Sequence, residues 1–238
     1  MSFYPIYLTH LNRKRVILLG GNDEAERKTG ELLSFGAQVH VISEELTDQM
    51  RSWVDHGDIT WTDRAYLYGD LTNTAFVVAA DYTPEIAENV SKEAHEKNLI
   101  INVMDNLPLS NSAFGSVVRQ GKLTVSFSTN GLAPALAVRL KERFQNELDD
   151  AYGAFLDLSE AIRDPVMRII VDPEKRKALW YEWVDSDTIS LLREGKRERA
   201  LDRTEAIWGH EVMVASGLRP DSGIIRNLFR KVFSLFTS

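Results

Sequence analysis

Short apolar runs that alternate with helical segments constrain the fold of this chain more than any other feature. The runs are rich in valine and isoleucine, and helix signals such as Thr83-Pro84-Glu85 lie between them. They comprise residues 16–19, 39–42, 75–80 and 99–103, with a weaker run at 59–62. Runs this short and apolar predict strands buried on both faces, joined by right-handed crossovers. The pattern predicts an α/β fold with a Rossmann-like, doubly wound parallel sheet.

The pattern changes twice beyond residue 105. Residues 113–118 and 123–128 flank a turn that contains glycine and predict a hairpin, after which Pro134 begins a helix. From residue 151 onward the sequence predicts short helices interrupted at Asp164-Pro165 and Asp172-Pro173, with a basic amphipathic stretch at 224–236. That stretch is interpreted as a terminal helix docked on its own protein, the alternative being a helix on a membrane surface.

Composition excludes several classes of function. The chain has 238 residues and a net charge of −7, which argues against a dedicated nucleic-acid binder. It contains no cysteine, so disulfides, thiolate metal sites and cysteine nucleophiles are ruled out. The apolar runs are far shorter than the about 20 residues that cross a bilayer. In the first residues the basic cluster follows the apolar residues, which is not the order found in a signal peptide. We therefore expect a cytoplasmic protein with no metal site and no nucleic-acid or membrane partner.

A glycine-rich turn follows the first predicted strand directly. In the dinucleotide fingerprint G-x-G-x-x-G/A, Gly20 takes the first place and Ala25 the last, but Asn22 replaces the second glycine. That glycine normally lets the backbone approach a pyrophosphate. Asparagine tolerates left-handed backbone angles better than most residues, so we expect the turn to survive and the approach to be impaired. The acids that follow suit the positive end of a helix, yet they would repel a pyrophosphate. The turn therefore predicts either a dinucleotide site or a helix start without a ligand.

Acidic residues follow two other predicted strands. In Ser43-Glu44-Glu45, a carboxylate could bind a ribose 2′-hydroxyl, which would favour NAD over NADP. The alternative is that Ser43 caps a helix and both glutamates lie in its first turn. Asp105 follows the run at 99–103, at the sheet edge where ligands bind in open α/β folds. It is either a general base or an ordinary turn residue.

Several stretches occur in an order that is typical of one family. They are Tyr4-Pro5-Ile6, Gly20-Gly21 with residues 25–28, Phe35-Gly36-Ala37, residues 102–105, residues 121–125 and residues 128–134. Through them the chain resembles the precorrin-2 dehydrogenase/sirohydrochlorin ferrochelatase family, the dehydrogenase module of siroheme synthases. The resemblance covers residues 4–148 closely and the helical remainder in outline.

The resemblance implies a function and an organisation. The family oxidises precorrin-2 to sirohydrochlorin with NAD, some members then insert Fe²⁺, and its members are homodimers. For this chain it implies an NAD-binding Rossmann-like domain at 1–111 and a dimerisation segment of hairpin plus helix at 112–150. A helical C-terminal domain would occupy 151–238. Fe²⁺ would be a substrate of chelation and not a resident metal.

The resemblance also assigns roles to residues found by the motif analysis. It places the catalytic aspartate of the family at Asp105. The candidate cofactor-binding residues are Gly20, Gly21, Asn22, Asp23, Glu24, Ser43, Glu44 and Glu45. The candidate residues for the tetrapyrrole are Ser128, Thr129, Asn130 and Gly131. Because precorrin-2 carries eight carboxylates, local positive charge is also expected, and its candidate sources are Arg119, Lys122, Arg139 and Arg143.

Some positions depart from the family pattern. Asn22 and Glu24 stand where a glycine and a small apolar residue are usual, and residues 80–83 replace Ala-Thr-Asp-Asp. Further departures are Ala87 in place of an asparagine and Gly115 in place of a proline. The departures at the sheet edge where the nucleotide is expected affect NAD affinity more than the fold. They motivate one alternative, a non-catalytic tetrapyrrole- or metal-binding protein that binds NAD weakly. Another is a related Rossmann protein with a different small-molecule substrate.

Overall fold

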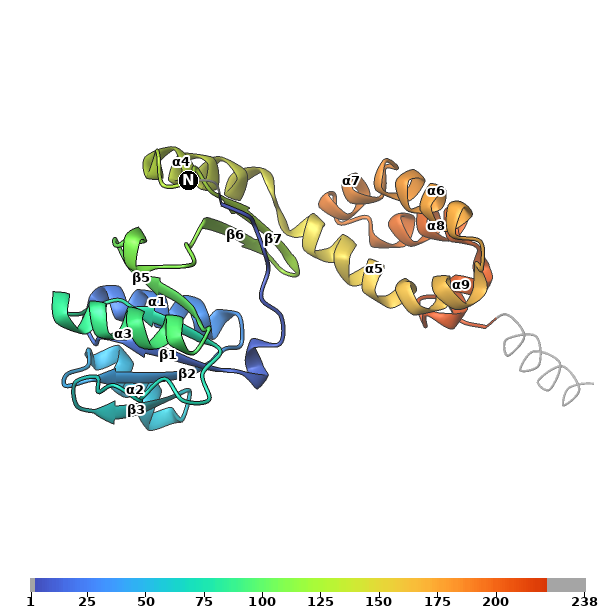
Figure 1. Ribbon diagram of the computed structural model, residues 1–238. Coiled ribbons are helices and arrows are strands. Elements are labelled where there is room, and N and C mark those ends of the chain that lie inside the picture. Colours follow the sequence, from blue (N-terminus) through green and yellow to red (C-terminus); the bar gives the residue numbers. More distant parts are fainter. Residues whose placement is uncertain (1–2, 222–238) are drawn as a thin grey trace, which may run out of the picture. The chain divides into compact units, whose positions relative to one another are not determined.

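The computed structural model describes residues 3–221, and the chain divides after Phe114 into two compact units (Figure 1). The predicted amphipathic helix at 224–236 lies outside the described residues. The predicted domain boundaries at 111 and 150 stay predictions.

The first unit is built around a five-stranded parallel sheet in the order β3-β2-β1-β4-β5. The weak run at 59–62 is a genuine edge strand, and the Rossmann-like prediction is confirmed. The strands are β1 (Arg15–Leu19), β2 (Gln38–Ser43), β3 (Ile59–Asp63), β4 (Phe76–Ala79) and β5 (Ile100–Val103). The helices are α1 (Asp23–Ser34), α2 (Asp48–His56) and α3 (Pro84–Glu96), with short 3-10 turns at Leu11–Arg13 and Leu107–Leu109.

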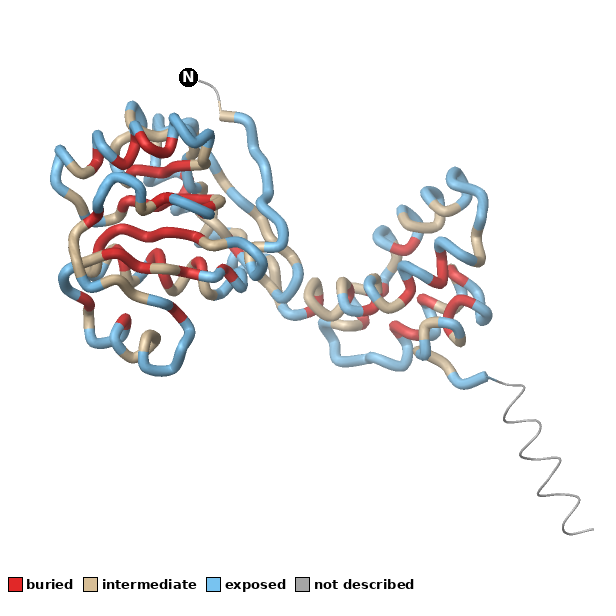
Figure 2. Tube along the Cα trace, turned by 60° about the horizontal axis from the view of Figure 1, so that its bottom comes forward, coloured by how far each residue is buried: buried red, intermediate tan, exposed pale blue. Residues whose placement is uncertain are grey.

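Both faces of this sheet are buried, as the apolar runs predict (Figure 2). Along β1, Val16 and Leu18 pack toward α1 and α2. The alternate residues Ile17 and Leu19 pack toward α3. Because successive side chains of a strand point to opposite faces, a run with no polar residue fills two cores at once.

The outer edge of β5 is satisfied by the chain that follows it. Asn111 accepts a hydrogen bond from the Ile101 amide at 2.8 Å and donates to the Leu99 carbonyl at 2.8 Å. Ser112 donates from its hydroxyl to the Ile101 carbonyl at 2.8 Å. Side chains thus replace a sixth strand and leave few unpaired backbone groups on this edge.

The second unit combines a small hairpin layer with a helical bundle. The hairpin is β6 (Ser116–Gln120) and β7 (Leu123–Phe127), followed by α4 (Pro134–Glu147). In this layer only Val118 and Ala137 are buried hydrophobic residues. The bundle comprises α5 (Asp150–Ile169), α6 (Pro173–Val184), α7 (Thr188–Arg193), α8 (Arg197–Trp208) and α9 (His210–Ala215). Its core contains Trp183, whose ring centroid lies 4.2 Å from that of Phe155.

One predicted helix break is wrong. The sequence predicts an interruption at Asp164-Pro165, but α5 continues through Pro165 to Ile169. A proline inside a helix removes one backbone hydrogen bond and costs about 3 kcal/mol or more. Pro165 is itself buried beside Ile162 and Val166, which belong to the bundle core. Packing against the bundle therefore offsets the local cost.

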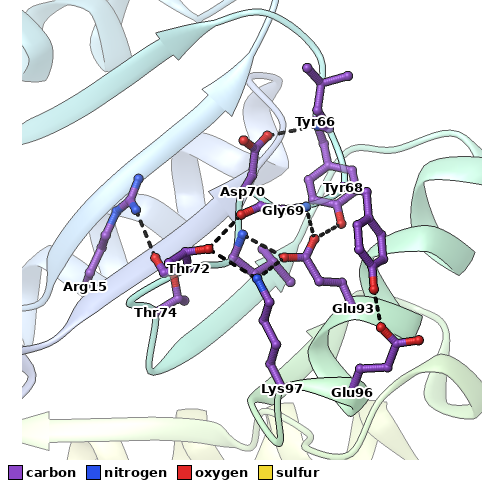
Figure 3. A network of polar contacts seen from close by, with 12 residues as sticks. Arg15, Tyr66, Tyr68, Gly69, Asp70, Thr72, Thr74, Glu93, Glu96 and Lys97 are labelled. Atoms are coloured by element: carbon purple, nitrogen blue, oxygen red, sulfur yellow. Dashed lines mark hydrogen bonds and ion pairs between the residues drawn. The ribbon is translucent and has the colours of Figure 1, made fainter.

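A buried carboxylate anchors the connection between β3 and β4, which contains no helix (Figure 3). The Glu93 side chain on α3 has no exposed surface and accepts hydrogen bonds from the amides of Gly69 and Leu71 at 2.8 and 3.1 Å. It also accepts from the Tyr66 hydroxyl and, at 2.6 Å, from the Lys97 ammonium. Burial alone would raise the pKa of Glu93, but these four donors together lower it. The ionised carboxylate therefore holds the crossover against α3.

We predict that Glu93→Gln lowers the free energy of unfolding by about 3 kcal/mol, because the buried donors lose their charged acceptor. Urea denaturation at pH 7 measures this loss. Because folding lowers the pKa of Glu93, its contribution is present above the unfolded pKa of about 4.3 and is lost as the pH falls through the folded value. The difference between parent and variant should therefore shrink below pH 4.

The matched control for this substitution is Glu96→Gln on the same helix, where the carboxylate accepts from the exposed Tyr68 hydroxyl. We expect the control to change stability by less than about 0.5 kcal/mol. Equal losses for both variants would mean that the Glu93 network does not stabilise the crossover.

Candidate functional site

The first strand marks the point where the sheet changes its direction of winding. The chain proceeds from β1 outward to β2 and β3, and then returns to the other side of β1 at β4. In open α/β sheets, ligands bind outside the carboxyl ends of the strands at such a switch point. Gly20 follows β1 there, and the amide of Asp81 after β4 donates to the Leu19 carbonyl at 3.1 Å.

The close approach between the chain after β1 and the chain after β4 requires a glycine at position 20. Its φ is +115°, and a Cβ atom on it would lie 2.5 Å from the Asp81 Cβ and 2.7 Å from the Asp81 amide nitrogen. Any other residue would collide with the chain leaving β4 and would also adopt a strained backbone angle. Asp81 therefore lies at the switch point, although it is not among the site residues predicted from the sequence. Its position directly after a predicted strand could have identified it as a site residue from the sequence.

Gly21 brings a third loop to the same place. A Cβ on Gly21 would lie 1.8 Å from the backbone oxygen of Glu45 and 2.8 Å from the Ser43 hydroxyl oxygen. The Thr47 amide donates to the Gly21 carbonyl at 3.1 Å. The structure thus gathers Gly20, Gly21 and the Ser43–Glu45 loop, which the sequence places in one cofactor site.

Asn22 has a role that was not predicted from the sequence. Its φ is −83° and its ψ −178°, so the backbone is extended and the left-handed conformation that asparagine tolerates is not used. Gly20 already supplies the positive φ of the turn, which leaves Asn22 as the N-cap of α1. Its side-chain oxygen accepts from the amides of Glu24 and Ala25 at 3.1 and 3.0 Å. These amides belong to the first turn of the helix, where phosphate groups bind in dinucleotide sites.

The acids at the start of α1 are partly neutralised. Glu24 forms an ion pair with Arg27, and the hydrogen bond from Arg27 lowers the pKa of Glu24. Asn22, Asp23, Glu24 and Arg27 line an open hollow on the surface. Arg27 was not among the predicted site residues, although its spacing of three from Glu24 on a helix predicts the pair. It supplies positive charge where an anionic ligand would need it.

The capping interpretation of Ser43 is wrong. Helix α2 begins at Asp48, and its N-cap is Thr47, whose hydroxyl accepts from the Met50 amide at 3.2 Å. Ser43 is the last residue of β2, and its hydroxyl accepts from the Glu45 amide at 3.4 Å inside the loop. Glu44 and Glu45 are exposed, and within residues 3–221 neither carboxylate forms a hydrogen bond or an ion pair. The two side chains can therefore contact a ligand at this edge.

Asp105 lies in a tight turn just after β5, on the same sheet edge. The turn is closed by the Asn106 amide, which donates to the Val103 carbonyl at 3.0 Å. Asp105 is exposed and has a φ of +58°, in the left-handed region that few residues other than glycine adopt. The strand end predicted from the sequence is thus present, and the carboxylate projects from a strained turn.

The candidate tetrapyrrole residues lie in the second unit, between β7 and α4. Ser128 accepts from the Asn130 amide at 3.2 Å, and Thr129 accepts from the Ala133 amide at 3.1 Å. Asn130 and Gly131 have φ values of +54° and +76°. The loop is therefore shaped by its own side chains. The placement of this loop near Asp105 stays a prediction, because the loop and Asp105 belong to different units.

Three of the cations expected to receive substrate carboxylates already have acidic partners. Lys122 contacts Asp157 and Glu160 at 2.8 and 2.5 Å. Arg139 pairs with Glu142 at 2.7 Å, and Arg143 pairs with Glu147 at 3.0 Å. These pairs are exposed, and such pairs contribute at most about 1 kcal/mol, so an anionic ligand can displace them.

Among residues 3–221, no helix is both long enough and apolar enough to cross a bilayer. The same residues contain no cluster of three or more His, Asp or Glu side chains positioned to hold a metal ion.

Two family models match the chain in consecutive stretches. A family described as "Putative NAD(P)-binding" matches residues 7–116. A family described as "Sirohaem synthase dimerisation region" matches residues 151–207. The first match covers the parallel sheet and all its loops, and the second covers most of the helical bundle.

Individual relatives agree with these matches. The chain is 29% identical over 217 residues to a siroheme synthase of Xylella fastidiosa (strain M12). The matched region covers 91% of this chain and 45% of that protein. It is 29% identical over 206 residues to a siroheme synthase of Azotobacter vinelandii, covering 87% and 44%. The chain thus spans less than half the length of these two relatives.

A solved structure shares the fold. It is named SirC, precorrin-2 dehydrogenase, and superimposes with a TM-score of 0.68 at 22% identity. The likeness covers 86% of this chain and 100% of that one. Together with the two family matches and the siroheme synthase relatives, this confirms the resemblance of the chain to the dehydrogenase module of siroheme synthases.

Proposed function

We propose that this protein oxidises precorrin-2 to sirohydrochlorin with NAD, as a step of siroheme biosynthesis. The observation that carries the proposal is the switch-point edge, where two glycines draw three loops together beside the Asp105 turn. The names of the relatives, siroheme synthase and precorrin-2 dehydrogenase, support the choice of substrate.

The residues at this edge fit a dinucleotide. Gly20 and Gly21 let the loops after β4 and β2 pack against the start of α1, and Arg27 balances one of the acids there. Glu44 and Glu45, in the loop after β2, would bind ribose hydroxyl groups. Asn22 occupies two of the helix amides, so a pyrophosphate would bind beside this cap or replace it.

In the proposed reaction, the substrate loses a hydride and a proton. Bound NAD would supply the hydride acceptor. The Asp105 carboxylate would take the proton, acting as a general base from the exposed turn after β5. The Ser128–Gly131 loop would hold the macrocycle with its hydroxyl and amide groups. Insertion of Fe²⁺, as a second substrate, stays a prediction from the resemblance.

A non-catalytic tetrapyrrole- or metal-binding protein is the alternative. The Asn22 cap favours it, because the cap competes with a pyrophosphate for helix amides. We favour the enzyme because Arg27 offsets the acidic character of the same site and because the named relatives are a dehydrogenase and synthases.

We further propose that the protein is a homodimer. The hairpin layer with α4 has a very small core of its own and exposes Leu132, Leu136 and Val138. The dimerisation family supports a dimer, although it matches residues 151–207 and not the 112–150 segment expected from the sequence.

We expect a dimer of about twice the chain mass of 27.0 kDa. Such an assembly should bury at least about 2,000 Å² and persist at micromolar concentration. Light scattering after size exclusion measures the mass, and a monomer at that concentration would refute the proposal.

For the cofactor, we predict that NAD binds about tenfold or more tightly than NADP, because Glu44 and Glu45 would repel a 2′-phosphate. Isothermal titration with each nucleotide measures both dissociation constants. Replacing both glutamates with glutamine should raise the affinity for NADP. Asp48→Asn, an exposed acid in the first turn of α2, serves as the control and should leave the ratio unchanged. Equal affinities in the parent would contradict the assignment.

For the catalytic base, we predict that Asp105→Asn lowers kcat by about 10²- to 10⁴-fold, because asparagine keeps the shape and cannot accept the proton. The measurement is NADH formation from precorrin-2 at saturating NAD. Asparagine also tolerates the left-handed backbone, so stability should change by less than about 1 kcal/mol in a thermal melt. The control is Asp63→Asn, an exposed aspartate at the end of β3 on the same edge. A rate within a few-fold of the parent would show that Asp105 is only a turn residue.

A further inference from the structure

The Tyr82 hydroxyl links the chain that leaves β4 to the turn that carries Asp105. It donates to the Met104 carbonyl at 2.5 Å, and the tyrosine ring packs against the core on the α3 face of the sheet. Tyr82 is half-buried, whereas its neighbours Asp81 and Thr83 are exposed.

The turn after β5 is held from two sides. On one side, Ser110 donates from its hydroxyl to the Asn106 carbonyl at 2.8 Å and accepts from the Val103 amide at 2.9 Å. On the other side, the Met104 amide donates to the Ala79 carbonyl at 2.9 Å. The Tyr82 hydroxyl then binds the carbonyl of the same Met104. Both hydrogen-bonding groups of the residue before Asp105 are therefore fixed to the β4 side.

Asp105 needs such support because of its backbone conformation. A left-handed aspartate costs roughly 1–2 kcal/mol relative to the right-handed form, and it persists only when its surroundings determine it. The carbonyl bound by Tyr82 belongs to the peptide group that joins Met104 to Asp105. Fixing that peptide plane restricts the φ of Asp105 and so the direction of its carboxylate.

We propose that Tyr82 is a positioning residue for Asp105: its hydroxyl holds the peptide group that sets the left-handed turn and aims the carboxylate. The inference rests on the proposed function for the catalytic role of Asp105. Burial and, to a smaller extent, the Asp105 carboxylate raise the pKa of Tyr82. The phenol therefore remains protonated near neutral pH and keeps its proton for the Met104 carbonyl.

Tyr82→Phe tests the proposal because it removes only the hydroxyl. The matched control is Tyr68→Phe, which removes an exposed hydroxyl bonded to Glu96 on α3. We expect hydrogen–deuterium exchange of the turn amides at 104–106 to be about 3- to 10-fold faster in Tyr82→Phe and unchanged in the control. This measurement does not depend on substrate, cofactor or activity.

The kinetic part uses a double-mutant cycle with Asp105→Asn. Tyr82→Phe alone should lower kcat by about 3- to 10-fold with an unchanged NAD dissociation constant. In the Asp105→Asn background, the same change should have no further effect, because the residue that it positions is already disabled. Tyr82→Leu should not restore kcat, because leucine also lacks a hydrogen-bond donor.

The outcomes separate the two proposals. If Asp105→Asn is slow while Tyr82→Phe matches the parent in exchange and in kcat, the positioning inference is wrong and the proposed function stands. An equal loss of kcat from Tyr82→Phe in both backgrounds would also overturn the inference, because Tyr82 would then act independently of Asp105. If Asp105→Asn itself turns over at the parental rate, the catalytic role of Asp105 fails.

Discussion

The close backbone approach at the end of β1 is the constraint on which the candidate site depends. Gly20 and Gly21 are surrounded so tightly that a methyl group would collide with the chain after β4 on one side and with the loop after β2 on the other. Steric exclusion of this kind permits little adjustment, because the colliding atoms are backbone atoms or lie next to the backbone. The two glycines thus fix the relative positions of the loops that carry Asp81 and Glu45, and they place both beside the start of α1.

The site edge is held in place by polar groups that replace regular structure. The crossover from β3 to β4 lacks a helix, and the buried Glu93 carboxylate takes over the task of tying it to α3. The edge strand β5 has no strand on its outer side, and Asn111 and Ser112 pair with its backbone there. In both places, carboxylate, amide or hydroxyl side chains satisfy backbone groups that would otherwise be unpaired. Asp105 is exposed at this edge, as are Glu44 and Glu45.

Tertiary contacts override three local preferences for one common reason. Ser43 was a candidate helix cap, Asn22 was a residue that tolerates left-handed angles, and Pro165 was expected to interrupt a helix. In each case the local preference of the residue is real, but a neighbour or the packing changes the outcome. Thr47 caps α2 in place of Ser43, Gly20 supplies the positive φ in place of Asn22, and the bundle core carries α5 through Pro165. Local propensities amount to about 1 kcal/mol, except for proline, and tertiary contacts exceed them.

The sequence by itself determined the parallel sheet, because apolar runs without alternation can be satisfied only by burial on both faces. It also located the strand ends at which Gly20, Ser43 and Asp105 lie, because the ends of the apolar runs mark the ends of the strands. Only the tertiary structure decided which strand ends are neighbours, and hence that Asp81 lies against Gly20 and that Tyr82 reaches the Met104 carbonyl. Strand order is set by crossovers and by packing between residues far apart in the chain, and no local pattern records those contacts.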